Sequence, residues 1–566
     1  MLKLKKKTKI WILAVLIAAV SVFGVAYEAD NDFKIVKSLD IYYTLFRELN
    51  LFYVDNTDPE KLVKTSIDAM LENLDPYTVY IPESEMEDFK FMTTGQYGGI
   101  GAVIRKSGDY AVIADPYEDF PAVKYGLKAG DLILEIDGKS IKDKEISQVS
   151  DMLKGTPNTP VELTVQREGA NKPFKKTLIR QIIKIDNVPY YGMVTDKIGY
   201  IRLSNFTSDA SKEVKAALID LKQNHHATSI ILDLRGNPGG LLNESVEIAN
   251  IFVPKGQEVV STRGRVKQWD NVYITKNEAV DANIPLAILV NRGSASASEI
   301  VAGSMQDLDR GVIIGERTFG KGLVQTTRPL SYNAQLKVTT AKYYIPSGRC
   351  IQALDYSHRN PDGSVGNIPD SLISEFKTKN GRKVFNGGGV IPDIPLKPEL
   401  LSQIAINLYS KNLIFDFATQ YSLLHASIDA PEKFSISDED YNQFIHFVEG
   451  KNFDYQTKTE ETFEDLKKIA IEEKYYDKSA DEFKLLEKKI AHNKSKDFIA
   501  FKDEIKQLLS EEIISRYYYQ RGRIKYSIRE DDQIGKAIEL LNNHQLYVSI
   551  LKGTKNTNDK ITAYRR

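Results

Sequence analysis

The segment 285–303, PLAILVNRGSASASEIVAG, runs from a continuous apolar stretch through a glycine- and serine-rich loop into a helical pattern. Two other segments have the same texture: SIILDLRGNPGG at 229–240 and GVIIGERTFGKG at 311–322. Continuous apolar runs are typical of strands buried on both faces of a parallel sheet. Repeated strand-loop-helix units place functional loops at the carboxyl ends of the strands. We therefore predict an α/β region over 199–396, with its chemistry in these loops.

The region before residue 94 is expected to be helical. Ile35, Leu39, Tyr42 and Phe46 are spaced three or four residues apart, which indicates an amphipathic helix. The pattern breaks at LDPYTVYIPES, which begins at Leu74. It predicts a helical segment in front of the first compact domain.

The stretch 98–183 alternates short apolar runs with turns, and one helical pattern begins at Ile146. These features predict a small β-barrel with helices, and the stretch resembles a PDZ domain. In that resemblance Gly99, Ile100 and Gly101 form a loop that binds a peptide carboxylate through backbone N–H groups, with the peptide added as a strand. Val149 and Leu153 would line the pocket. The alternative is a glycine-rich hairpin without a ligand.

The overall charge gives no indication of a nucleic-acid partner, and the N-terminal sequence predicts an exported protein. It has 566 residues, 76 basic against 77 acidic side chains and a formal net charge of −1, so no global charge directs it to an acidic partner. Five lysines precede an uncharged run, 10–27, which predicts an export signal and favours an uncleaved membrane anchor. Cys350 is the single cysteine, so an intrachain disulfide and a structural zinc-thiolate site are excluded.

Two of the loops contain a candidate nucleophile and a candidate base. Ser294, Ser296 and Ser298 compete as nucleophile in the first loop, although a strand-to-helix turn also favours serine as an N-cap. Lys321 lies between two glycines after the strand GVIIG. Its amine would act as a general base if burial lowered its pKa, and serine-lysine pairs are an established variant of nucleophilic catalysis. An ordinary solvated lysine is the alternative.

The third loop, DLRGNPGG, is a candidate for part of an oxyanion hole. Gly239 and Gly240 can adopt conformations that aim backbone N–H groups at one point. Asp233 and Arg235 are interpreted as a structural ion pair rather than as catalytic groups.

Motifs in a fixed order carry a resemblance to the carboxyl-terminal processing peptidases, also called tail-specific proteases. They are LDPYT (74–78), GGIG (98–101), GYIRLSNF (199–206), DLRGNPGG (233–240), GSASASEI (293–300), GERTFGKGLVQ (315–325), YYIPSGRCIQ (343–352) and GGVIPDIPL (388–396). The resemblance implies Ser296 as nucleophile, Lys321 as base and Gln325 as the residue that positions the lysine. It also implies an oxyanion hole from Ala297 and the Gly239-Gly240 turn, with either glycine as donor.

The resemblance further implies a multidomain α/β protein that needs no metal or organic cofactor and that assembles as a homodimer. We predict five parts: a signal segment (1–27), an N-terminal helical segment (28–93), an inserted PDZ domain (94–183), a crotonase-like serine peptidase core (184–398) and a helical C-terminal extension (399–566). The predicted substrates are envelope proteins cut near their C-termini on the periplasmic side of a membrane.

Rival interpretations remain. A serine-histidine-aspartate triad is the poorer one, because His358 is the only histidine near the motifs and lies in the polar stretch SHRNPDG. No HExxH pattern supports a metalloprotease. A crotonase-like acyl-CoA enzyme and a non-catalytic PDZ scaffold on a peptidase-like core are the alternative functions.

Overall fold

The computed structural model describes residues 32–398 and 400–554, which divide into two units, 1–80 and 81–566. In the first unit, residues 32–52 are helical and α2 is Pro59–Glu72. Asp58 caps α2 by accepting a hydrogen bond from the Lys61 N–H at 3.1 Å, and Pro59 occupies the first turn, where its missing N–H costs nothing. Strand β1 (Val79–Ile81) spans the division between the units.

The predicted membrane anchor, 1–27, lies outside the described residues. Within 32–398 and 400–554, no helix has the length and apolar character that crossing a bilayer requires.

The second unit begins with the short helix η1 (Glu83–Glu85) and α3 (Met86–Thr94), which lead into the barrel predicted from its turns and apolar runs. Its sheet has the order β3-β4-β5-β7-β8, with β6 beside β5 and with β3 as an edge strand. The apolar run GGIGAVI, 98–104, is divided between two strands, β2 and β3, because Gly101 has φ 74° and turns the chain between them. The barrel elements are β2 (Gln96–Gly99), β3 (Ala102–Ser107), β4 (Tyr110–Pro116), α4 (Pro121–Lys124), β5 (Leu132–Ile136), β6 (Lys139–Ser140), α5 (Ile146–Leu153), β7 (Pro160–Gln166), β8 (Phe174–Ile179) and β9 (Gln181–Lys184).

The α/β region is built on a six-stranded sheet of order β10-β11-β12-β15-β16-β23. Its strands are β10 (Tyr190–Met193), β11 (Ile198–Arg202), β12 (Ser229–Asp233), β15 (Leu286–Val290), β16 (Val312–Gly315) and β23 (Ile394–Pro395). From β11 to β23 all neighbours are parallel, and every residue of β12, β15 and β16 is buried. The continuous apolar runs therefore form the parallel strands that the sequence predicts.

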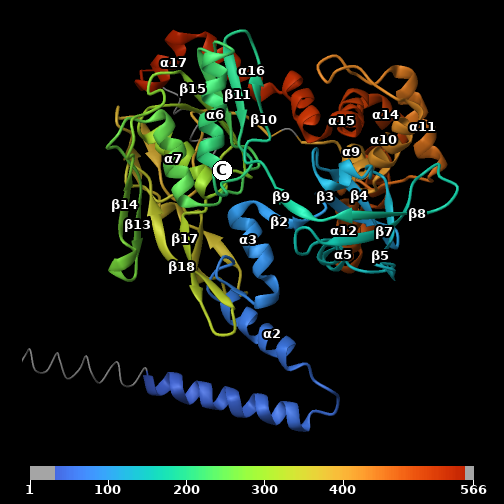
Figure 1. Cartoon of the computed structure of the whole chain (residues 1–566), viewed down its shortest axis with the longest axis horizontal. Coiled ribbons are helices and arrows are strands. Elements are labelled where there is room, and N and C mark those ends of the chain that lie inside the picture. The colour runs from blue at the N-terminus through green and yellow to red at the C-terminus, as the bar shows by residue number, and fades with distance from the viewer. Residues whose placement is uncertain (1–31, 399, 555–566) are drawn as a thin grey trace, which may run out of the picture. The chain divides into compact units, whose positions relative to one another are not determined.

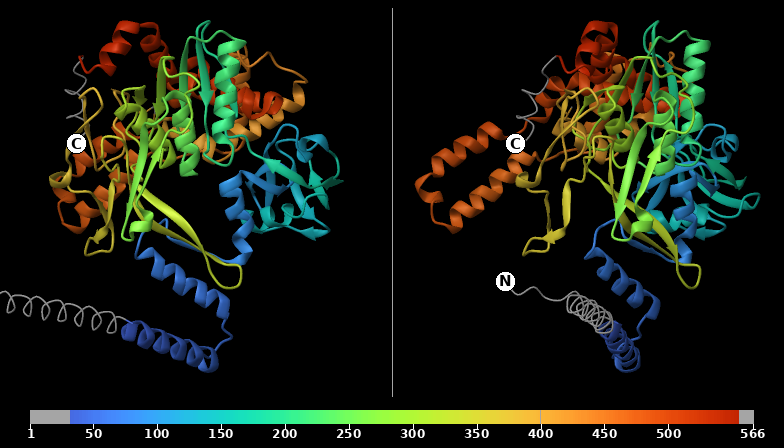
Figure 2. Two further views of the ribbon diagram at one scale, coloured as in Figure 1. Left: turned by 60° about the vertical axis from the view of Figure 1, so that its left-hand side comes forward. Right: turned by 90° about the vertical axis from the view of Figure 1, so that its left-hand side faces the viewer.

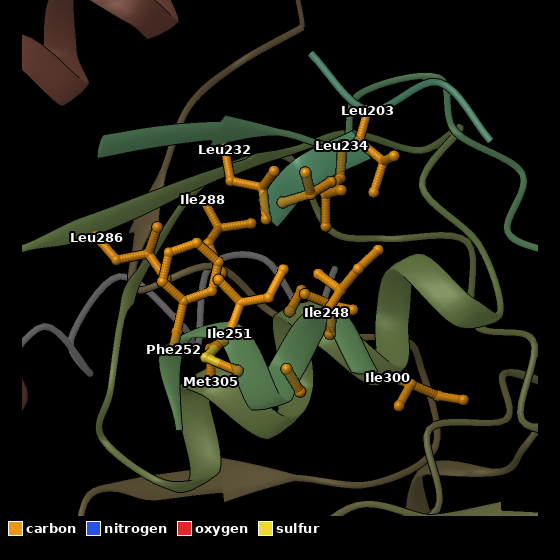
Figure 3. Packing of buried hydrophobic residues seen from close by; sticks show 14 of the residues in the cluster. Leu203, Leu232, Leu234, Ile248, Ile251, Phe252, Leu286, Ile288, Ile300 and Met305 are labelled. Carbon is orange, nitrogen blue, oxygen red and sulfur yellow. The ribbon is translucent and has the colours of Figure 1, made fainter. Parts of the chain in front are cut away.

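Successive residues of these strands face opposite sides of the sheet, and helices cover both sides. On one side Leu232, Leu286 and Ile288 pack against α6 (Ala210–Gln223), α7 (Leu242–Phe252) and α8 (Ala297–Asp307), as Figure 3 shows for Ile248, Ile251, Phe252, Ile300 and Met305. On the other side Ile231, Leu289 and Ile314 pack against α16 (Asp532–Asn542) and α17 (His544–Leu551). The last helices of the described chain thus complete this core.

A second sheet, which contains β17, β18, β13 and β14, lies beside this core (Figure 1). Its longest pairing is the antiparallel hairpin β17–β18. The remaining elements of this part are β13 (Glu258–Gly264), η2 (Lys267–Trp269), β14 (Asn271–Ile274), β17 (Leu323–Pro329), β18 (Gln335–Tyr344), β19 (Leu354–Arg359), β20 (Val365–Asn367), η3 (Asp370–Leu372), β21 (Glu375–Lys377) and β22 (Lys383–Phe385).

The C-terminal part is helical, as predicted, and packs against the barrel (Figure 1). The Gln420 amide donates to Glu168 at 2.7 Å, and Gly130 approaches Thr419 so closely that a Cβ at that glycine would clash. The helices are α9 (Gln403–Ser410), α10 (Leu413–Leu424), α11 (Asp438–Gly450), α12 (Lys458–Glu472), η4 (Tyr476–Lys478), α13 (Ala480–Ile490), α14 (Lys494–Ala500), α15 (Lys502–Ser527) and η5 (Ile528–Glu530). Helices α12 and α13 form a hairpin that projects from the body, drawn in orange to red in the right-hand view of Figure 2.

Candidate active site

Three loops that follow neighbouring parallel strands meet at one edge of the six-stranded sheet. DLRGNPGG follows β12, NRGSASAS follows β15, and ERTFGKG follows β16. Because the three strands are adjacent and parallel, their carboxyl ends bring the loops together, although Gly240 and Lys321 are 81 positions apart in the sequence.

The middle of the three candidate serines is the one that faces open space. Ser294 is buried and donates its hydroxyl to the Leu234 carbonyl at 2.8 Å, and Ser298 is buried and donates to the Asn237 carbonyl at 2.9 Å. Ser296 is half-buried and lines a cavity of about 500 Å³. Its backbone has φ 55° and ψ −112°. Residues other than glycine rarely adopt this conformation, and where they do it is often at a functional site.

Lys321 and Gln325 line the same cavity as Ser296. Lys321 comes from the loop after β16, whereas Gln325 lies on β17 and its amide donates to the Thr339 hydroxyl at 3.2 Å. The glycine loop and α3 also contribute to the cavity wall. The residues that line the cavity are Phe89, Phe91, Met92, Thr93, Gly95, Ile185, Asn205, Thr207, 238–242, Ser296, Ala297, Ile300, Lys321, 323–325, Thr327, Lys337 and Tyr343.

A buried carboxylate, Glu299, ties the serine turn to the lysine loop. One oxygen accepts hydrogen bonds from the Ser296 N–H at 2.8 Å and the Lys321 N–H at 2.9 Å. The other accepts from the Thr318 hydroxyl at 2.6 Å and the Gly320 N–H at 2.7 Å. Because the same side chain holds both loops, it sets the distance between the backbones of Ser296 and Lys321.

The charge state of Glu299 results from two opposing effects. Burial raises the pKa of Glu299 to about 7, while the hydrogen bonds from Thr318, Lys321, Ser296 and Gly320 lower it. All four partners are donors, so the ionised carboxylate satisfies every one of them and a protonated carboxyl does not.

The glycine loop lies directly against the serine turn. A Cβ on Gly239 would lie within 2.9 Å of Ala297 N and Ser296 Cβ, so only glycine allows this approach. The Gly239 N–H donates to Asn237 Oδ1 at 2.9 Å, within its own loop. Gly240 has φ 148°, is exposed and, like Ala297, lines the cavity. Of the two glycines, Gly240 therefore has the amide better placed to receive a ligand.

Asp233 and Arg235 form an ion pair at 2.7 Å, as the sequence interpretation has it. Burial alone would raise the pKa of Asp233, but the charges of Arg235 and Arg202 lower it to about 2. Arg235 also pairs with Asp531, the N-cap of α16, at 2.7 Å. This network anchors the glycine loop to the C-terminal helices.

The predicted peptide-binding residues come together at one end of the barrel. Gly99 ends β2, and Ile100 and Gly101 form the turn into the edge strand β3. Val149 and Leu153 are the buried residues of α5, which packs beside β3, and both belong to the same hydrophobic cluster as Ile100. The edge strand β3 and the helix α5 thus lie side by side.

Sequence reasoning missed several residues that the fold brings to the site. Glu299 follows Ser296 by three positions, and this S-x-x-E spacing is the signal that could have identified it as a partner of the serine backbone. The Tyr343 hydroxyl donates to the Ser296 carbonyl at 3.2 Å, and Lys337 lines the cavity; neither has a local sequence signal. Among the described residues that line the cavity there is no histidine, and His358 is instead exposed beside Asp355 at 2.8 Å.

Three family models match separate parts of the chain. The family model "Peptidase family S41" matches residues 197–362, a PDZ domain model matches 112–167, and "Probable PDZ-protease, C-terminal helical domain" matches 404–541.

Among similar proteins, the carboxy-terminal-processing protease of Bartonella bacilliformis is 38% identical over 361 residues, which cover 63% of this chain and 80% of that protein. A probable CtpA-like serine protease of Staphylococcus aureus strain N315 is 37% identical over 309 residues, 54% of this chain and 61% of that protein. Among solved structures, the photosystem II D1 C-terminal processing protease is 29% identical, with a TM-score of 0.35, and the match covers 64% of this chain and 93% of that one.

Proposed function

Since the chain belongs to peptidase family S41, the family of the carboxy-terminal-processing proteases, and is therefore a serine-type peptidase, we propose that Ser296 and Lys321 form its nucleophile and general base. The observation that carries this assignment is the shared cavity, in which Ser296 is the one serine of its loop that is not fully buried and lies with Lys321, Gln325 and the glycine turn. The alternatives, a non-catalytic scaffold and an acyl-CoA enzyme, leave this arrangement without a role.

In the first half of the proposed reaction, the neutral Lys321 amine removes the proton from the Ser296 hydroxyl, and Ser296 Oγ attacks the substrate carbonyl carbon. The carbonyl oxygen becomes an oxyanion, which accepts hydrogen bonds from the N–H groups of Ala297 and Gly240. The N-terminus of α8 adds a favourable electrostatic field there, because backbone N–H groups at this end are unpaired. The lysine ammonium then donates its proton to the leaving amine, and an acyl-enzyme remains.

In the second half, Lys321 removes a proton from water, and the hydroxide attacks the acyl carbon. Collapse of the second tetrahedral intermediate breaks the bond to Ser296 Oγ, which regains a proton from Lys321. Gln325 is proposed to position the lysine, and Glu299 to hold the two loops at a working distance.

The PDZ domain is proposed to select substrates by their C-termini. The exposed edge of β3 supports this role, because a peptide can add there as a further strand with its carboxylate at the Gly99–Gly101 turn. The α5 face beside it is apolar, so the last residue of the substrate is expected to be apolar.

The test uses the purified chain and an unstructured protein with an apolar C-terminus. We expect cleavage near that end, none with Ser296→Ala, and slower cleavage when the terminal carboxylate is amidated. Intact substrate after prolonged incubation with the parent protein would contradict the proposed function. Equal cleavage rates for free and amidated substrates would contradict only the proposed role of the PDZ domain.

The location is also a proposal, and it depends on the charge pattern of the first 27 residues. The peptidase is proposed to be anchored by its N-terminus, with the catalytic part on the periplasmic side and with envelope proteins as substrates. Protease added to intact spheroplasts should then digest the region after Glu28. Recovery of the undigested chain in the cytosol would contradict this topology. Assembly as a homodimer stays a prediction, which sedimentation equilibrium can test.

A further inference from the structure

A second lysine, Lys337, lines the catalytic cavity, and the reaction described above does not use it. It lies on β18 opposite Thr327 of β17. Two positions further along β18, Thr339 lies opposite Gln325, so the two cross-strand pairs share one face of the hairpin. Lys337 is therefore one step further out along the cavity wall than the pair that contains Gln325.

The cavity offers this ammonium no carboxylate partner among the described residues that line it. Lys321 and Lys337 are the charged residues of this lining, and the remainder are apolar or neutral. Lys337 is half-buried, and this burial lowers its pKa. A cation that is partly removed from water gains most from an anion supplied by a ligand.

We propose that Lys337 binds a carboxylate of the substrate while the peptide bond lies at Ser296. This inference rests on the proposed peptidase function and adds a specificity element to it. Lys337 lies two residues, about 6.6 to 6.8 Å, along β18 from Thr339, which is opposite Gln325. Because Ser296 lines the same cavity, the carboxylate lies within a few residues of the scissile bond of an extended substrate. The carboxylate is either the C-terminus of a short tail or the side chain of an aspartate or glutamate.

The experiment measures kcat/KM for the full chain with a matched series of short fluorogenic peptides around one cleavable bond. One pair differs only in a free or amidated C-terminus two or three residues beyond that bond. Other pairs are amidated and carry Asp or Asn at single positions on either side of it. The readout is the ratio of kcat/KM between the carboxylate peptide and its neutral partner.

We expect one pair to give a ratio of about 10 with the parent protein, and the pair that does so identifies the source of the carboxylate. Lys337→Gln should reduce that ratio to near 1, Lys337→Arg should keep most of it, and Lys337→Glu should favour a peptide with Lys at the same position. Lys342→Gln is the matched control, because Lys342 is an exposed lysine of the same strand that does not line the cavity. The PDZ domain is the same in all variants, so the change in ratio reports Lys337.

A ratio that Lys337→Gln leaves at the parental value overturns the proposal, and an equal loss for both peptides of a pair does so too. If the thermal midpoint shows that Lys337→Gln is poorly folded, the same kcat/KM ratio measured with Lys337→Arg and Lys337→Glu tests the proposal. Failure of the parent protein to cleave any peptide contradicts the proposed function instead, so the two failures are distinguishable.

Discussion

Helices α8 and α13 have eleven residues each but opposite environments. Every residue of α8, Ala297–Asp307, is buried, whereas none of the eleven residues of α13, Ala480–Ile490, all of which the structure describes, is buried. The apolar pattern of each helix does not by itself predict so complete a contrast. Helix α8 includes Ser298, Glu299 and Asp307, and α13 has the regular apolar spacing of a helix with one covered face.

The difference teaches that burial follows position in the fold more than apolar pattern. The polar groups of α8 are tolerated inside because other parts of the chain satisfy them: Glu299 accepts four hydrogen bonds, and Asp307 pairs with Arg349 at 2.9 Å. These contacts hold the helix that begins at Ser296 in one place. Helix α13 packs against α12 and η4 in the projecting hairpin.

The largest expected effect comes from removing the groups proposed to react. Ser296→Ala should leave no measurable cleavage, because it removes the nucleophile, and Lys321→Ala should lower kcat/KM by about 10² to 10⁴, since a general base commonly contributes that factor. Lys321→Arg should be no better, because a guanidinium keeps its proton. Lys484→Ala on α13 is the control and should keep parental turnover. Peptide turnover and thermal midpoints measure this, and an arginine variant within tenfold of the parent would remove Lys321 from the role of base.

A truncation in each helix tests the contrast in packing directly. Met305→Ala in α8 removes a fully buried side chain and should destabilise the protein by about 2 to 5 kcal/mol. Leu485→Ala in α13 removes an exposed one, and its effect should stay within about 0.5 kcal/mol. Urea midpoints of the two variants provide the comparison. Similar losses in both would mean that α13 is covered in solution.

The same chemical change in each helix separates a buried carboxylate from an exposed one. Glu299→Gln replaces one oxygen by an NH₂ group that must face N–H or O–H donors, so we expect a loss of about 1 to 3 kcal/mol and a clear fall in kcat/KM. Glu482→Gln on α13 should change neither. Thermal midpoints and peptide turnover are the measurements, and parental activity in Glu299→Gln would show that the carboxylate does not hold the two loops.

The smallest expected effect is a pH dependence from Glu299. Its folded pKa of about 7 lies above the ordinary glutamate value of about 4.5, so the folded protein binds this proton more tightly than the unfolded chain does. The contribution of Glu299 to stability is therefore greatest below pH 4.5 and is lost as the pH rises through 7. Activity should change in the opposite direction, because the ionised carboxylate satisfies the donors of both loops. Comparing the pH slope of the thermal midpoint in the parent and in Glu299→Gln tests this, and identical slopes would contradict it.

Local patterns were sufficient for much of the fold. The apolar runs at 229–234, 285–290 and 311–315 are β12, β15 and β16, and the pattern from Ile146 is α5. The family followed from motifs whose order and spacing are properties of the chain itself. The crotonase-like description of the core and the exact domain boundaries stay predictions.

The catalytic environment could not be predicted in the same way. Local sequence identified a strand-to-helix turn with three serines, but the buried hydroxyl bonds of Ser294 and Ser298 depend on the loop after β12. Likewise, the Asn237 side chain accepts the Gly239 N–H, so this N–H is not available to an oxyanion. The composition of the loop does not predict that hydrogen bond.

The sequence by itself determined where strands and helices form, which residues carry reactive groups and which family the chain belongs to, because these depend on spacing along the chain. Only the tertiary structure decided that Glu299 joins the serine turn to the lysine loop, that Lys337 enters the cavity and that α16 and α17 cover the second face of the sheet. These contacts join segments far apart in the chain. An amphipathic helix or a charged side chain does not specify its partner, and the choice depends on burying both faces of the sheet and pairing the polar groups enclosed with them.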